Sequence, residues 1–190
     1  IRSWNSKKWQ FSVIIDNMMN LELLTVASSL TGDNSYYDKA KSHADHTLLN
    51  HFRPDGSSFH VVSYDTLTGK VLNRVTHQGV NDQSAWSRGQ AWGLYGFTMM
   101  YRQTGKKEYL DLLKDRIDEL VDLGLPKVWT VNACAMGHCL ITLYQATGEQ
   151  QYHDILMSKI AYLRKDALRF GDHVLQHTVS ANNDFPEQCW

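Results

Sequence analysis

The chain has 190 residues, of which 43% are hydrophobic and 21% are charged, and its formal net charge at pH 7 is -1. This composition is typical of one globular domain over residues 1–190, and the balanced charge argues against a nucleic-acid partner. No apolar stretch approaches the roughly 18 residues that a membrane span needs. We therefore expect a cytoplasmic protein, or a periplasmic one if a leader has been removed.

Apolar residues recur with helical spacing along most of the chain. The pattern predicts helices at residues 12–30, 35–51, 83–103, 107–122, 131–146 and 149–168. Between the second and third helices, β-branched and aromatic residues flank a Thr-Leu-Thr-Gly turn, which predicts one small β-hairpin. The three prolines lie outside the predicted helices, as expected of residues that break them.

A helical hairpin with a Thr-Gly connection occurs three times. The tyrosine that opens each second helix follows the threonine by five residues, in the pairs Thr31 and Tyr36, Thr104 and Tyr109, and Thr147 and Tyr152. Each glycine suits the left-handed position that follows a helix end. We expect each tyrosine ring to pack between two helices while its hydroxyl reaches water.

Repeated helix pairs close either into a superhelix of fixed period or into a toroid of inner and outer helices. Here the Thr-Gly connections are 73 and 43 residues apart, and a β-hairpin interrupts them. The uneven spacing favours an all-α fold of the α/α toroid type, with functional loops at one end.

The segment NDQSAWSRGQAWGLYGF, residues 81–97, places unusual polar chemistry at a predicted helix start. Asp82 is either the N-cap of that helix or a carboxylic acid directed into a cavity, and Ser84 could cap the helix in its place. Trp86 and Gln90 fall on nearly one helical face, where they suit a sugar subsite or an ordinary core. The glycines within this helix predict close helix packing.

A second acid, Asp16, lies in the apolar segment SVIIDNMMNLELL. Its carboxyl is either buried and bonded to neighbouring helix ends or directed into a wet cavity, with Asn20 one turn further on. Two acids in one cavity suggest glycoside chemistry. His60 and His77 are candidates for the rim of the site, although a lone histidine is more often structural. The nine histidines and three cysteines show no metal-ligand spacing, so we expect neither metal nor cofactor.

The strings SVIIDNMMNLELL, SSFHVVSYD and THQGVNDQSAWSRGQAWGLYGFTMMYRQTG resemble the middle of the unsaturated glucuronyl hydrolases, glycoside hydrolase family 88. The resemblance covers residues 1–112 and implies an α/α toroid acting on oligosaccharides with a C4–C5 unsaturated uronic acid. It implies Asp82 as general acid and base, and Asp16 as the second carboxylate. The candidate substrate-binding residues are Trp86, Gln90, His77, His60, Asn20, Arg88 and Trp129.

Residues 113–190 resemble instead the early part of the unsaturated rhamnogalacturonyl hydrolases, family 105. In that family the stretch similar to FPEQCW precedes the aspartate-containing helix that corresponds to the one at Asp16. The toroid is therefore expected to be incomplete or permuted, within a single α/α domain made of the two segments.

Three functions remain open at this point. The first is a hydrolase of unsaturated uronic acids, which the motifs around both acids favour. The second is an inactive or sugar-binding α/α scaffold, which an incomplete toroid would favour. The third, an ordinary two-carboxylate glycosidase, explains the acids but not the Arg-Gly-Gln-Ala-Trp string. The parent polysaccharide and the oligomeric state stay open as well.

Overall fold

A computed structural model describes residues 10–122, 124, 136–167, 169–170 and 174–175. The candidate Trp129 lies outside these residues. The chain divides into two compact units, Ile1–Arg116 and Ile117–Trp190, and each is described here by itself.

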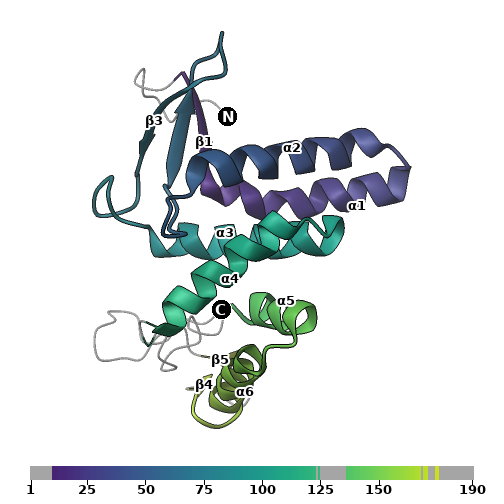
Figure 1. Cartoon of the computed structure of the whole chain (residues 1–190), viewed down its shortest axis with the longest axis vertical. Helices are drawn as coiled ribbons and strands as arrows, with labels where there is room; N and C mark the ends of the chain where they lie inside the picture. Colours follow the sequence, from purple (N-terminus) through teal and green to yellow (C-terminus); the bar gives the residue numbers. More distant parts are fainter. Residues whose placement is uncertain (1–9, 123, 125–135, 168, 171–173, 176–190) are drawn as a thin grey trace. The chain divides into compact units, whose positions relative to one another are not determined.

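The first unit contains a three-stranded antiparallel sheet in the order β1-β2-β3 (Figure 1). Its strands are β1 (Phe11–Ile14), β2 (Val61–Tyr64) and β3 (Val71–Val75). The last two form the predicted hairpin, which is thereby confirmed. The prediction of a helix from residue 12 is wrong, because Val13 and its neighbours pair with Val62 on β2 and so form a strand instead.

Helices follow the sheet in a hairpin. A 3-10 helix, η1 (Ile15–Asn20), leads into α1 (Leu21–Thr31), and α2 (Asn34–His51) returns beside it (Figure 1). The third helix, α3 (Ser87–Thr104), packs on η1 and α1. It begins four residues later than predicted, so the segment that carries Asp82 is a loop rather than a helix start.

The glycines of α3 allow η1 to approach it closely, as the sequence predicted. A Cβ atom on Gly96 would lie 2.5 Å from the Met18 Cβ and 2.7 Å from the Met18 carbonyl oxygen. A Cβ atom on Gly89 would lie 2.9 Å from Ile15 Cγ2. Ile15 and Met18 are fully buried by this contact, which fixes the helix that carries Asp16.

Helix α4 (Lys107–Asp122) contains the boundary between the units, and the second unit continues with α5 (Gly137–Thr147) and α6 (Gln150–Lys165). Two short strands, β4 (Arg169–Phe170) and β5 (Val174–Leu175), pair with each other. The mostly helical fold with a small sheet is as predicted. Among the described residues, no helix is both long and apolar enough to cross a membrane.

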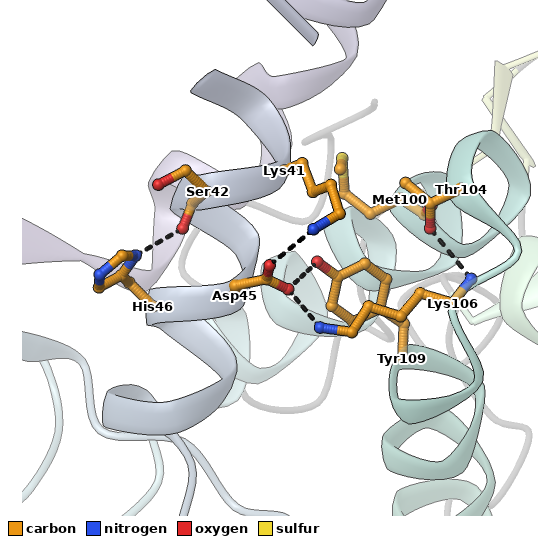
Figure 2. Close-up of polar contacts among 8 residues, drawn as sticks. All are labelled: Lys41, Ser42, Asp45, His46, Met100, Thr104, Lys106 and Tyr109. Carbon is orange, nitrogen blue, oxygen red and sulfur yellow. Dashed lines mark hydrogen bonds and ion pairs between the residues drawn. The ribbon is translucent and has the colours of Figure 1, made fainter. Parts of the chain in front are cut away.

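The three Thr-Gly connections adopt the predicted geometry. Gly32, Gly105 and Gly148 have φ values of 72°, 66° and 72° at the helix ends. The expectation that the tyrosine hydroxyls reach water is wrong for two of the three repeats. Tyr109 donates to Asp45 Oδ1 at 2.5 Å (Figure 2), and Tyr152 donates to Asp118 Oδ1 at 2.7 Å. Both rings are fully buried, so a hydroxyl without such an acceptor would be costly.

Candidate active site

Asp16 and His60 lie side by side in the first unit. Asp16 is in η1, directly after β1, and the amide of the preceding Ile15 donates to the His60 carbonyl oxygen at 3.0 Å. Asp16 Oδ2 is 3.8 Å from His60 Nε2, which is longer than a hydrogen bond. Neither atom has a hydrogen-bond partner among the described residues. The Asp16 side chain is 23% exposed, whereas that of His60 is fully buried.

Two backbone amides fix the tautomer of His60. His77 N and Gln78 N donate to His60 Nδ1 at 3.0 and 3.2 Å. Because Nδ1 accepts both bonds, the proton of the neutral ring is on Nε2 and faces Asp16. Burial lowers the pKa of His60, against the opposing effect of the Asp16 carboxylate. The site therefore holds a neutral imidazole that offers one N–H to the side of Asp16.

Asp82 does not occupy the position that the sequence suggested. The N-cap of α3 is Trp86, which makes no side-chain capping bond, so neither Asp82 nor Ser84 caps this helix. Asp82 is exposed, and its Oδ1 accepts from Thr76 N at 2.8 Å. Ser84 bonds to Asn81 within the same loop. The carboxylate of Asp82 thus closes the loop that runs from residue 76 to residue 84.

The aromatic ring of Trp86 packs on His60, with ring centroids 4.6 Å apart. The guanidinium of Arg88, which is exposed, lies 5.7 Å from the centroid of the Trp86 ring. His77 is exposed, and its ring centroid is 6.4 Å from that of His60. The structure thus brings Asp16, His60, Trp86 and His77 together. Asn20 is exposed at the last position of η1, four residues beyond Asp16.

Gln90 supports a loop. Its Oε1 accepts from Ser58 N at 2.9 Å and from Ser58 Oγ at 3.3 Å, and its Nε2 donates to the Gly56 carbonyl oxygen at 3.2 Å. The side chain is 7% exposed. These bonds hold the loop that leads to His60, and they occupy most of the hydrogen-bonding capacity of the amide.

Arg53 is a residue of this site that the sequence interpretation missed. Its guanidinium donates to Ser58 O and Asp82 O, and it therefore contacts the loops on both sides of the site. The turn signal Pro54-Asp55-Gly56 beside it marks a tight loop but does not reveal the second contact.

A cavity of the first unit lies elsewhere, between β1, β2 and α2. Its volume is about 850 Å³, and Phe11, Tyr64 and His43 contribute to its wall, whereas Asp16 and His60 do not. No cluster of three metal-ligating side chains occurs in the part of the chain that the structure describes.

A protein-family comparison matches residues 63–190 to Glycosyl Hydrolase Family 88. The match runs through residues 113–190, so the segment that resembles family 105 lies within a family-88 match as well. An unsaturated glucuronyl hydrolase of Formosa agariphila is 40% identical over 94% of the chain. An unsaturated chondroitin disaccharide hydrolase of Streptococcus pneumoniae is 42% identical over 60% of the chain.

The chain is also similar to solved structures of unsaturated glucuronyl hydrolases. An unsaturated glucuronyl hydrolase specific for heparin superposes with a TM-score of 0.82 at 38% identity and covers 95% of the chain. A Streptococcus agalactiae unsaturated glucuronyl hydrolase superposes with a TM-score of 0.77 at 25% identity. These neighbours are α/α toroid enzymes, which confirms the expected fold class. The chain spans about half of their length, 51% of the Formosa agariphila enzyme and 55% of the heparin-specific one.

Proposed function

This chain belongs to glycosyl hydrolase family 88, and we propose from this that it removes a C4–C5 unsaturated uronic acid from the non-reducing end of an oligosaccharide. The relatives, an unsaturated glucuronyl hydrolase and an unsaturated chondroitin disaccharide hydrolase, support this substrate class. The observation that carries the proposal is the half-buried Asp16 carboxyl, whose Oδ2 is unbonded and lies beside a neutral His60.

The reaction that the family implies needs an acid rather than a nucleophile. The unsaturated sugar is a vinyl ether whose double bond is conjugated to its carboxylate. A carboxylic acid protonates C4, and water adds at C5 while a base accepts its proton. The resulting hemiketal opens and releases the neighbouring sugar, so the anomeric carbon is never attacked. One carboxyl group can act as the acid and then as the base.

Asp16 fits the role of this acid and base better than Asp82. The Asp16 side chain is 23% exposed, and its buried Oδ2 has no hydrogen-bond partner among the described residues. The His60 N–H beside it can orient either the carboxyl or the attacking water. Asp82 is exposed, and its Oδ1 is already bonded to the Thr76 amide. We therefore exchange the roles that the family resemblance implies: Asp16 transfers the proton, and Asp82 holds the loop beside His60.

Arg88 and Trp86 supply what an anionic sugar requires. The exposed guanidinium of Arg88 can bind the uronate carboxylate through two N–H donors. The ring of Trp86 offers a flat apolar face next to His60, which suits a sugar ring. In this proposal His77 and Asn20 contribute to the rim of the site, and Gln90 positions the loop before His60.

Two amide variants test the function and the assignment together. The substrate is an unsaturated glucuronyl disaccharide, and the ultraviolet absorbance of its conjugated alkene disappears on hydration. Asp16→Asn should lower kcat by about 10²–10⁴-fold, the usual contribution of a general acid and base. Asp82→Asn keeps an oxygen that accepts from Thr76 N, so we expect it to lower kcat by less than about tenfold.

The results distinguish an error in the assignment of the acid from an error in the proposed function. An inactive Asp82→Asn with a nearly active Asp16→Asn would return the acid to Asp82. If the folded parent chain leaves the alkene intact, the hydrolase proposal is wrong for this chain, and the scaffold alternative replaces it.

A further inference from the structure

A single guanidinium connects the two loops on either side of the site. Arg53 follows α2, and its NH1 group donates to Ser57 Oγ and to the Ser58 carbonyl oxygen, each at 3.1 Å. Its NH2 group donates to the carbonyl oxygens of Asp82 at 3.0 Å and Ser84 at 3.4 Å. The planar fork lies 3.8 Å from the centroid of the Phe59 ring. Four acceptors and an aromatic face thus fix one side chain.

Each of the two loops carries part of the surroundings of Asp16. Ser58 lies two residues before His60, in the segment that enters β2. Asp82 lies in the other loop, and its Oδ1 accepts from the Thr76 amide. The next two amides, those of His77 and Gln78, donate to His60 Nδ1. A continuous series of contacts therefore runs from Arg53 through Asp82 and residues 76–78 to His60, which faces Asp16.

We propose that Arg53 is a positioning residue of this site: its fork holds the Asp82 loop so that the His77 and Gln78 amides keep the His60 N–H directed at Asp16. The expected effect of Arg53 on catalysis rests on the proposed function. Its expected effect on the loop and on His60 does not. Arg53 touches no reacting atom in this view and acts only through His60.

Two variants separate the geometry of the fork from its charge. Arg53→Lys keeps the positive charge but cannot reach four acceptors in one plane, whereas Arg53→Met keeps only the apolar stem. Arg74→Lys is the matched control. Arg74 also donates to a backbone carbonyl, that of Asn50 at 2.7 Å, but it contacts none of the residues between Arg53 and Asp16.

The first measurement is steady-state kinetics on the unsaturated disaccharide. Displacing a catalytic group by about 1 Å can lower a rate by about 10²-fold. We expect both Arg53 variants to lower kcat by about 10–100-fold with a KM within about threefold of the parent value. The acidic limb of the kcat profile should move as well, because His60 loses the amides that keep its Nδ1 unprotonated. Arg74→Lys should behave as the parent does.

The second measurement does not need activity. Hydrogen exchange of the Thr76, His77 and Gln78 amides should accelerate at least about tenfold in both Arg53 variants, while the amides of α2 and α3 keep their protection. The ¹⁵N chemical shift of His60 Nδ1 should move away from the value of a ring nitrogen that accepts hydrogen bonds. Unchanged exchange rates of the three loop amides, together with an unchanged ¹⁵N shift of His60, would overturn the proposal whether or not the chain is active. A loss of protection throughout the first unit in both variants would also overturn it, because Arg53 would then be a general stability residue.

Discussion

Buried histidines that stay neutral recur in the first unit, and each is held by the backbone. His60 accepts two amides on Nδ1, whereas His51 donates from Nε2 to the Val13 carbonyl oxygen at 3.2 Å. Burial lowers the pKa of His51 to about 3, although its bond to Val13 opposes the shift. His51 joins the end of α2 to β1, so its neutral form is part of the frame that places Asp16.

This neutral imidazole predicts an acid-labile fold. The ordinary pKa of histidine is 6.5, so the unfolded chain gains a proton at His51 near that pH, whereas the folded chain does not until about pH 3. Stability from this residue is therefore complete above pH 6.5. It falls by up to about 1.4 kcal/mol per pH unit below that value.

His51→Gln keeps a donor for Val13 but cannot titrate. The slope of the unfolding free energy between pH 6 and 4, from urea titrations at each pH, should be smaller in this variant by about 1 kcal/mol per unit. His46→Gln removes an exposed imidazole and should keep the slope of the parent. Equal slopes in the parent and His51→Gln would show that His51 is not the group concerned.

Single residues in the site differ in how far the sequence could predict them. Asp16, His60 and Trp86 lie in distinctive strings, and the structure brings them together. The contacts of Arg53 depend instead on a loop that is 29 residues away in the sequence. The spacing of Asp82 from the apolar residues predicts an N-cap at a helix start, but Asp82 lies in a loop, where its Oδ1 accepts from the Thr76 amide.

At the scale of elements, the hairpin repeat extends further than the Thr-Gly connection. Asp45 follows Tyr36 by nine residues and accepts from Tyr109 of the next hairpin, whereas Asp118 follows Tyr109 by nine and accepts from Tyr152. Helices α2 and α4 thus each carry both a tyrosine and the acceptor for the tyrosine of the next hairpin, whereas α6 has Ala161 nine residues after Tyr152. The nine-residue interval is visible in the sequence. That each aspartate accepts from the tyrosine of the next hairpin is visible only in the fold.

Asp45 accepts from lysine side chains as well as from a tyrosine. It receives bonds from Tyr109, from Lys106 at 2.6 Å and from Lys41 at 3.1 Å (Figure 2). Burial alone would raise the pKa of Asp45, but these three donors outweigh it and lower the pKa to about 2. The stabilisation from this carboxylate is therefore present above about pH 4 and is lost as the pH falls through about 2.

Removing the tyrosine donor should weaken the packing between α2 and α4. Tyr109→Phe keeps the buried ring but deletes its bond to a charged acceptor, and we expect it to lower the free energy of unfolding by about 1–2 kcal/mol. Urea denaturation at pH 7 measures this. Tyr101→Phe is the control, since the Tyr101 hydroxyl has no hydrogen-bond partner among the described residues. A Tyr109→Phe variant as stable as the control would mean that the bond adds nothing to stability.

The apolar pattern predicts the wrong element at the start of the first unit. Residues 11–14 continue an apolar run that also fits a helix, and periodicity alone cannot separate a short strand from a helical turn. Pairing with β2 decides the matter, and β2 lies some 50 residues further along the chain. By contrast, α4 has the bounds that the sequence predicts, because its apolar face and the Thr-Gly connection before it are both local signals.

At the scale of the whole molecule, α1 leaves an apolar face uncovered. Leu23, Val26 and Leu30 are 71%, 45% and 82% exposed, and they lie three and four residues apart on one side of the helix. The formal net charge of -1 and the isoelectric point near 6.8 provide little repulsion between copies at neutral pH. An apolar stripe under weak repulsion favours self-association.

Light scattering over a range of chain concentrations at pH 7 should therefore show an apparent mass that rises above 21.8 kDa. The double variant Leu23→Glu, Leu30→Glu places two charges on the stripe and should keep the mass at the monomer value. A control variant, Leu67→Glu, adds one charge at a leucine that is 93% exposed on the hairpin turn, outside the stripe, and should associate as the parent does. If Leu67→Glu abolishes association as completely as the stripe variant, net charge rather than the α1 face controls it.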